Sequence, residues 1–222
     1  MGERCVTTSV NAARNEFSVE VARNATLVAE AFRLRHQVYC IENTYEAGRN
    51  GLEQDEFDSN ARHIVLRRRS TAEVVGTVRV VLPGRTLPIH GVCTPASLHS
   101  LPWHKTGEIS RFSLSKARRV GSGEAGGMMR LGLMQGILRV SQEAGLTHWC
   151  AVMERSLLRL LQTTAIYFQP IGPLVEFHGP RQPAIGRIDT ILDRMRREAG
   201  PIFDYVTEDG TLWPVRVHRL AA

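Results

Sequence analysis

The sequence predicts an α/β (α+β) fold in which a central mixed, mostly antiparallel sheet is flanked by helices. Two observations lead to this prediction. Short apolar runs with a two-residue period, typical of strands, alternate with longer segments of helical periodicity. The 222 residues, with 43% hydrophobic and 23% charged, are ordinary for a soluble globular protein with one large core. We therefore expect a single domain over residues 1–222.

The first elements precede an acidic loop. Residues 1–16 form a loose lead-in, and Glu16–Val21 alternates apolar and polar residues as a half-buried strand does. Asn24 is placed to cap a helix over Ala25–Tyr39. Residues 43–60 are polar, acidic and contain glycine, which predicts a loop.

A hairpin follows the loop. His63–Arg69 and Glu73–Leu82 are rich in strand-forming residues and are joined by the short connection 70–72. Residues 83–106 contain four prolines, so we expect an irregular insertion there. Glu108–Leu114 predicts the next strand.

The second half of the chain alternates between helical and extended patterns. The elements expected there are a helix over Gly127–Ala144, a strand over Thr147–Met153, a helix over Glu154–Ala165, a proline-broken extended segment over Tyr167–His178, a helix over Ile188–Arg197 and a short strand over Ile202–Val206. This order supports a mixed sheet with helices on both faces.

Charge and cysteine content narrow the function classes. The net charge of +6 suits nucleic acid, an acidic protein partner or a phosphate-bearing carrier. No helix-turn-helix, zinc-finger or RNP signature accompanies it, so a basic nucleic-acid-binding module remains only an alternative. The four cysteines lie far apart without a C-x-x-C pair, which predicts neither a disulfide framework nor a metal site. Without a signal-peptide pattern or a membrane-spanning run, we expect a cytoplasmic protein.

Five charged or polar clusters stand in a fixed order along the chain. They are Arg35-His36-Gln37-Val38-Tyr39, Asp55-Glu56-Phe57-Asp58, Gly76-Thr77-Val78-Arg79, Glu108-Ile109-Ser110-Arg111-Phe112 and the glycine-rich stretch Gly121–Gly127. Two of them lie inside apolar strand-like runs, where a charge is costly unless it is paired or used. They therefore predict either buried ion pairs or a cleft that handles a polar substrate.

Strand alternation predicts how the fourth cluster is divided between the two faces of its strand. Glu108, Ser110 and Phe112 are expected on one face, and Arg111 with Ser113 on the other.

In this order and at these spacings, the clusters resemble the acyl-homoserine-lactone synthases and the wider group of bacterial acyltransferases that make N-acyl amino acids from acyl carrier protein. The C-terminal half is similar to a further branch, the acyltransferases associated with PEP-CTERM/exosortase systems. The resemblance implies a GNAT-like fold and transfer of a long-chain fatty acyl group from acyl carrier protein to the amine of an amino acid or similar small acceptor. No tightly bound cofactor is implied, because the acyl-phosphopantetheine is a co-substrate.

The resemblance also implies site residues. Glu108, Ser110 and Arg111 match the E-x-S-R-F element beside the donor cleft and are the expected catalytic residues. The acceptor region is expected to be organised by Arg35, Tyr39, Asp55, Asp58 and Arg79. For these charged residues, a purely structural ion-pair network is the alternative to direct substrate contact.

Donor binding is expected at the end of the strand and in the glycine-rich segment. The candidate residues are Phe112, Ser113, Leu114, Arg118, Arg119, Gly121 and Gly123. Backbone N–H groups at a helix N-terminus bind phosphate well, and a flexible loop is the alternative. Lys116, Arg118, Arg119 and Arg130 would then face the acidic surface of an acyl carrier protein.

The acyl chain is expected in an apolar pocket. Its candidate lining residues are Leu131, Met134, Leu138, Val152, Leu157 and Leu161, and membership of the ordinary core is the alternative for each. With the chain bound there, an acceptor amine would attack the thioester, and Glu108 would serve as a base directly or through water.

The homoserine-lactone synthases carry a Trp shortly after the R-x-x-V-F element, near their S-adenosylmethionine site. Residues 40–46 of this chain contain none. The acceptor therefore stays open, with S-adenosylmethionine and an acyl- or acetyl-CoA-dependent N-acetyltransferase reaction as alternatives.

Overall fold

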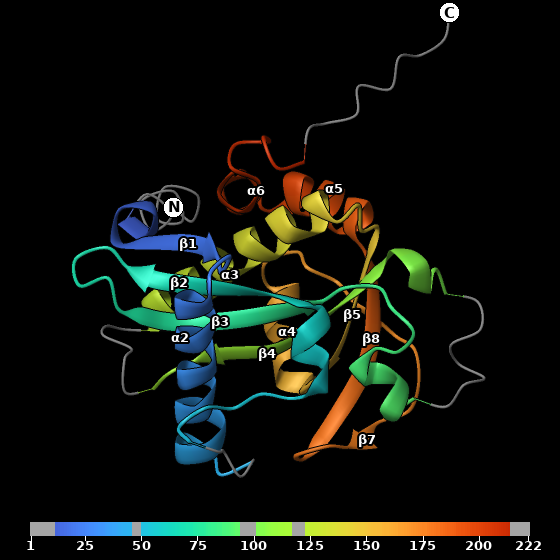
Figure 1. Ribbon diagram of the computed structural model, residues 1–222. Helices are drawn as coiled ribbons and strands as arrows, with labels where there is room; N and C mark the ends of the chain where they lie inside the picture. The colour runs from blue at the N-terminus through green and yellow to red at the C-terminus, as the bar shows by residue number, and fades with distance from the viewer. Residues whose placement is uncertain (1–11, 46–49, 94–100, 117–122, 214–222) are drawn as a thin grey trace, which may run out of the picture.

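The computed structural model describes residues 12–45, 50–93, 101–116 and 123–213 (Figure 1). The side chains of residues 123–125 lie outside this description, as do the expected donor residues Arg118, Arg119 and Gly121.

In the part of the chain that the structure describes, a single sheet of eight strands organises the fold. The strands are β1 Phe17–Val21, β2 Ala61–Arg68, β3 Val74–Val81, β4 Thr106–Leu114, β5 His148–Met153, β6 Gln169–Pro170, β7 Val175–Glu176 and β8 Pro180–Arg187. Their order is β1-β2-β3-β4-β5-β8-β6, with β7 paired to β8 off this path. The β4–β5 pair is parallel and the other pairs are antiparallel. The sheet is therefore mixed and mostly antiparallel, as predicted.

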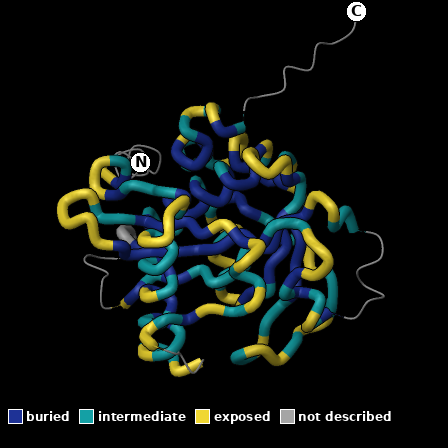
Figure 2. Tube along the Cα trace, viewed as in Figure 1, coloured by how far each residue is buried: buried dark blue, intermediate teal, exposed yellow. Residues whose placement is uncertain are grey.

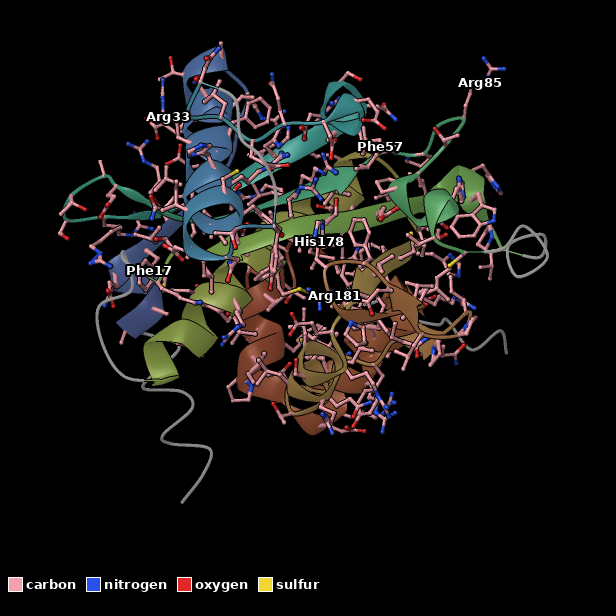
Figure 3. All side chains as sticks on the ribbon, turned by 90° about the horizontal axis from the view of Figure 1, so that it is seen from below. Phe17, Arg33, Phe57, Arg85, His178 and Arg181 are labelled. Atoms are coloured by element: carbon pink, nitrogen blue, oxygen red, sulfur yellow. The ribbon has the colours of Figure 1, made fainter. Side chains whose placement is uncertain are left out.

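Helices cover both faces of the sheet. They are α2 Ala25–Arg35, α3 Gly123–Glu143, α4 Arg155–Gln162, α5 Ile188–Glu198 and α6 Gly200–Thr207. Seen from below, α2 lies on one side of the sheet and α3 on the other (Figure 3). Asn24 caps α2 by accepting a hydrogen bond from the N–H of Leu27, as the sequence predicted.

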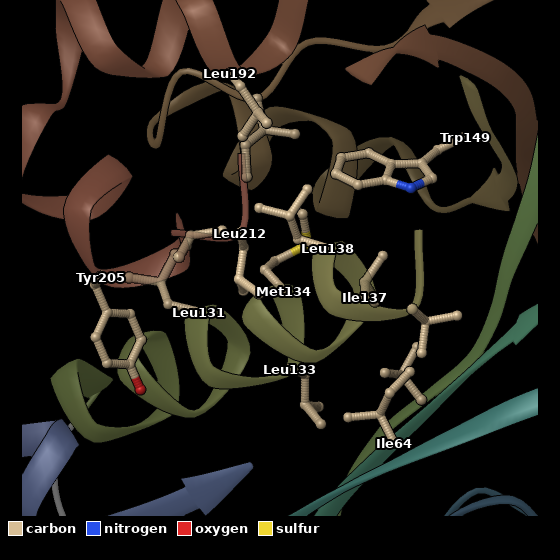
Figure 4. Close-up of a cluster of buried hydrophobic side chains, with 14 of the residues drawn as sticks. Ile64, Leu131, Leu133, Met134, Ile137, Leu138, Trp149, Leu192, Tyr205 and Leu212 are labelled. Carbon is tan, nitrogen blue, oxygen red and sulfur yellow. The ribbon is translucent and has the colours of Figure 1, made fainter. Parts of the chain in front are cut away.

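The main core lies between the sheet and α3, α5 and α6 (Figures 2 and 4). Leu133, Ile137 and Leu138 of α3 are fully buried there. Trp149 of β5 is also fully buried, and its indole N–H donates to the hydroxyl of Ser141 at 2.7 Å. This core holds the β1–β5 platform in place.

Several parts of the chain differ from the predictions. Residues 12–16, expected in the loose lead-in, are helical, and Ala13 is buried in the main core. Ile202–Val206 lies inside helix α6 and not in a strand. Phe203 and Val206, three positions apart on one helix face, are buried in the main core together with Tyr205. Strand β8 was missed because Pro180 and Pro183 argue against a strand.

A further difference concerns the end of helix α2. The α-helix stops at Arg35, and residues 36–42 continue it as the π-helical segment η1 His36–Glu42. The predicted helix over Ala25–Tyr39 is therefore correct in position but not in type over its last turn. Such π segments are rare and are not signalled by periodicity.

Candidate functional site

Strands β4 and β5 separate part-way along their length. They pair from Thr106 with His148 to Glu108 with Cys150, and no pair between them follows in the described residues. Beyond this point, Ile109 of β4 packs in a small apolar cluster with Ala151 and Met153 of β5. The other members of the cluster are Leu157, Leu158, Leu161, Phe168 and Ala184. We call the region where the pairing of β4 with β5 has ended, and where this cluster packs, the β4–β5 gap.

A β-bulge lies on β4 beside this gap. Thr77 pairs with Ser113 and Arg79 with Ser110, so β4 has one more residue than β3 between these two pairs. Arg111 adopts φ = 53° there, in the left-handed region that a residue with a Cβ rarely occupies. The bulge is the point where β4 departs from regular strand geometry.

The bulge overturns the predicted division of β4 between its faces. Arg111 reaches the same Asp55 carboxylate as Arg79, whose Nε donates to Ser110 Oγ at 2.9 Å, so Ser110 and Arg111 share a face. Phe112 instead packs with Ile109 against the main core. The extra residue shifts the alternation by one position, which sequence periodicity alone cannot reveal.

Six charged side chains close a ring on this face. In order, the ring runs through Arg35, Glu53, Arg111, Asp55, Arg79 and Asp58, and back to Arg35. Each arginine contacts two carboxylates and each carboxylate contacts two arginines, so the three positive and three negative charges balance. We call this set the charged ring.

One half of the charged ring centres on Glu53. Arg35 Nε donates to Glu53 Oε2 at 2.5 Å, and Arg111 Nε donates to Glu53 Oε1 at 3.0 Å. Arg111 Nη2 continues to Asp55 Oδ2 at 3.0 Å. This half joins the end of α2 to the bulge of β4.

The other half joins β3 to the acidic loop. Arg79 donates to Asp55 at 2.5 and 2.8 Å and to Asp58 Oδ1 at 2.7 Å. Arg35 contacts Asp58 through two hydrogen bonds of 2.7 and 3.0 Å. Arg35 and Arg79 are each only 1% exposed, so these pairs are shielded from water.

The loop that supplies the carboxylates is itself fixed locally. Asp55 caps the short helix η2 Glu56–Asn60 by accepting from the N–H of Phe57, and Asp58 accepts from the N–H of Asp55. This capping box makes each aspartate both a backbone anchor and a member of the charged ring.

Burial and ion pairing compete in the charged ring. Burial alone would raise the pKa of Asp58, but hydrogen bonds and charge from Arg35 and the charge of Arg79 hold that pKa well below its usual range. Burial would likewise lower the pKa of Arg79, but its carboxylate partners raise it. Ion pairing thus favours the charged forms of Asp58 and Arg79.

Glu108 has a different environment on the same strand. Its side chain is 2% exposed, and Oε2 accepts from the N–H of Ile89 at 2.7 Å. Ile89 belongs to the short helix η3 Pro88–Gly91, part of the predicted irregular insertion, which packs in an apolar cluster with Cys93 and Cys150. Burial raises the pKa of Glu108 to about 8. Near neutral pH this carboxyl can therefore either hold or release a proton.

Aromatic contacts link the charged ring to the far side of the gap. The Arg111 guanidinium lies over the Tyr39 ring at 5.3 Å from its centroid. Tyr39 contacts Tyr45, which stacks on His178 in the turn between β7 and β8. The segment after η1 and the β7–β8 turn therefore meet.

Of the expected donor residues, Ser113, Leu114 and Gly123 are described together with Phe112. Ser113 is buried and donates from Oγ to the Arg111 carbonyl at 3.0 Å, which supports the bulge. Leu114 packs against the main core, and Gly123 is the first residue of α3. The expected contacts of Arg118, Arg119 and Gly121 lie outside the described residues.

The expected acyl-pocket residues do not lie together. Leu131, Met134 and Leu138 belong to the main core, and Val152 belongs to the cluster beneath η3. Leu157 and Leu161 of α4 border the β4–β5 gap. Only these two of the six lie in the cluster that lines the gap.

The charged ring contains one residue that the sequence reasoning missed. Glu53 is 5% exposed and lies two positions before Asp55. A count of charges could not have pointed to it, because the five clusters already contain more carboxylates than arginines. Its position in the same acidic loop as Asp55 and Asp58 was the available signal.

A surface groove of about 880 Å³ runs between α2, the helix η2 and the start of β2. Asp55 and Asp58 of the charged ring and His63 are among its lining residues. In the described part of the chain, no cluster of His, Cys, Asp or Glu side chains could hold a metal ion. No described helix is long and apolar enough to span a membrane.

Residues 34–128 match the family described as "Acetyltransferase (GNAT) domain". No curated protein matches the sequence. The matched segment contains the whole charged ring, Glu108 and the bulge.

Several solved structures share the fold. The AHL synthase LasI is 18% identical with a TM-score of 0.61, over 77% of this chain and 89% of that chain. The N-acyl amino acid synthase FeeM, from uncultured soil microbes, is 14% identical with a TM-score of 0.60, over 82% and 96%. The CoA-dependent acyl-homoserine lactone synthase BjaI, solved with SAM and isopentyl-CoA, is 22% identical with a TM-score of 0.59, over 83% and 89%. The chain therefore has a GNAT-like acyltransferase fold.

Proposed function

We propose that the protein is an N-acyltransferase that moves a long-chain fatty acyl group from acyl carrier protein to the amine of an amino acid or similar small acceptor. The observation that carries the proposal is the end of the β4–β5 pairing after Glu108, close to the Arg111 bulge. Beyond this point the described backbone of β4 has no partner strand in β5, and ion pairs of Arg111 with Glu53 and Asp55 hold this part of β4 in place.

In this proposal the thioester lies in the β4–β5 gap. Backbone N–H groups of β4 near the bulge stabilise the oxyanion that forms when the amine attacks the carbonyl. The acyl chain extends along Ile109, Leu157 and Leu161, which already form an apolar cluster. Each buried methylene adds about 0.8 kcal/mol, so a long chain is strongly preferred over acetyl.

The reaction requires one net proton transfer, from the attacking amine to the leaving thiol. The amine nitrogen forms the C–N bond, the C–S bond breaks, and the phosphopantetheine thiol leaves with the proton that the amine gives up. Glu108, with a pKa of about 8, is matched to an α-amino group whose pKa is about 8, so the proton moves between them at little cost. Because Glu108 is buried, we propose that the proton reaches it through water.

The charged ring has a positioning role in this mechanism. The guanidiniums of Arg35 and Arg79 and the carboxylates of Asp55 and Asp58 are engaged with one another. We propose that they act on the acceptor through the shape of the bulge and through Tyr39.

Two acyl donors are candidates. The positive net charge favours an acidic carrier protein, and α4 presents exposed Arg155 and Arg159 beside the gap. BjaI is described as CoA-dependent, which favours an acyl-CoA donor as the second candidate. We also propose, from the resemblance of the C-terminal half, that the protein is an acyltransferase of the branch associated with PEP-CTERM/exosortase systems.

The test is a donor competition with mass spectrometry of the products. The purified protein is given palmitoyl-acyl carrier protein, palmitoyl-CoA or acetyl-CoA with a mixture of amino acids, and Glu108→Gln serves as the inactive control. The proposal predicts an N-palmitoyl amino acid that forms fastest from the carrier protein and disappears in the control. Acetylated products alone, or equal formation with Glu108→Gln, would contradict it.

A further inference from the structure

Glu53 closes the charged ring from a loop position that none of the five sequence clusters includes. Its carboxylate is 5% exposed and binds Arg35 through one oxygen and Arg111 through the other. Its backbone N–H donates to the Phe32 carbonyl at 3.2 Å, which fixes the loop against α2. Glu53 therefore connects α2 directly to the bulge of β4.

The backbone of Arg111 needs such a connection. Its φ of 53° is unfavourable for a residue with a Cβ, and such a conformation persists only where the surroundings hold it. The Arg111 side chain is held by hydrogen bonds to Glu53 and Asp55 and by its contact with the face of the Tyr39 ring. Of these, Glu53 is the more deeply buried carboxylate, at 5% exposed against 20% for Asp55.

Charge balance makes Glu53 indispensable to the ring. Without its carboxylate, three arginines would face two aspartates in a region shielded from water. The unbalanced positive charge would fall on Arg35 and Arg111, which lose their shared partner. Of the two, Arg111 is the more exposed, at 13% against 1% for Arg35, so its side chain has more room to turn towards solvent.

We propose that Glu53 is a positioning residue for acyl transfer: it holds Arg111, and with it the bulge of β4, in the geometry that presents the β4 backbone to the thioester. This inference rests on the proposed function. Glu53 touches neither substrate in this account and acts through Arg111.

The first test compares Glu53→Gln, Glu53→Asp and Glu56→Gln. Glu56 lies in the same loop but is exposed, so it is the matched control. We expect Glu53→Gln to lower kcat by about 10²-fold per folded molecule, since small displacements of reacting groups cost this much. Glu53→Asp, which keeps the charge, should recover part of the loss, and Glu56→Gln should match the wild type. A wild-type kcat in Glu53→Gln would overturn the proposal.

The second test does not depend on activity. In ¹⁵N NMR spectra, the Nε–H groups of Arg35 and Arg111 should give slowly exchanging signals in the wild type and in Glu56→Gln. Glu53→Gln should lose the protection of the Arg111 Nε–H while the protein stays folded. If the wild type transfers no acyl group, the proposed function fails, and this signal alone decides whether Glu53 holds Arg111. Unchanged protection in Glu53→Gln would overturn the positioning role.

Discussion

The two sides of the β4–β5 gap are built in opposite ways. On the β3 and α2 side, six charged side chains, each at most 20% exposed, are satisfied by one another. On the β5 side, α4 carries four leucines, yet none of its residues is buried, whereas α5 buries four of its residues. A fully satisfied ionic network admits few alternative arrangements, while an incompletely covered apolar face can accept further apolar atoms. The comparison suggests a fixed wall that positions the reacting groups and an adaptable wall that receives the acyl chain.

The largest expected effect comes from breaking the fixed wall. Arg79→Ala leaves Asp55 and Asp58 each without one of their arginine partners in a buried setting. We expect a loss of about 3–5 kcal/mol in the free energy of unfolding, measured by urea denaturation. Arg85→Ala is the control, because Arg85 is exposed and projects away from the fold (Figure 3). A loss equal to that of the control would mean that the ring contributes little to stability.

The second effect concerns the proton on Glu108. Glu108→Gln removes the titratable group but keeps a similar shape, so acyl transfer should fall by about 10²–10⁴-fold with little change in folding. In the wild type, kcat/KM should rise as the pH increases towards about 8, where the carboxyl ionises. A pH profile that stays flat from pH 6 to pH 9 would contradict a role for Glu108 as the base.

The same residue predicts a pH dependence of stability. Between pH 4.5 and about pH 8, folded Glu108 keeps a proton that the unfolded chain has released. The stability that this group contributes is present below pH 4.5 and is lost as the pH rises, by up to about 1.4 kcal/mol per pH unit. Glu108→Gln should lack this slope. The difference in free energy of unfolding, variant minus wild type, should therefore increase as the pH rises from about 4.5 to about 8. Parallel curves for the two proteins would show that the carboxyl is not held neutral by burial.

The smallest effect on stability is expected on the adaptable wall. Leu157→Ala, at a half-buried position, should cost less than about 1 kcal/mol, while Leu138→Ala in the main core should cost about 2–5 kcal/mol. Leu157→Ala should nevertheless lower transfer of palmitoyl relative to a short acyl group by several-fold, measured as a ratio of kcat/KM values. An unchanged ratio would remove α4 from the acyl site.

Sequence patterns predicted most of the platform but not the details that shape the site. The hairpin of β2 and β3, the strand β4 and the helix α3 follow directly from periodicity and turn residues. The bulge at Arg111 could not be predicted, because it depends on the register between β3 and β4. Strand β8 was hidden by its prolines, and Ile202–Val206 formed a helix because burial against the core outweighs strand propensity.

The candidate site was predictable as a set of residues and not as a geometry. Arg35, Asp55, Asp58, Arg79 and Arg111 were all expected, and the structure shows that they bind one another. The acyl-pocket leucines of α3 and α4 have the same apolar character in sequence, and only the fold separates Leu138 in the core from Leu157 at the gap.

The most direct test of the account is a crystal structure with a non-hydrolysable palmitoyl-pantetheine analogue. The account predicts that the carbonyl oxygen accepts a hydrogen bond from a β4 backbone N–H next to Arg111, with the chain against Leu157 and Leu161. A chain bound in the groove between α2 and η2, which Asp55, Asp58 and His63 line, would contradict it.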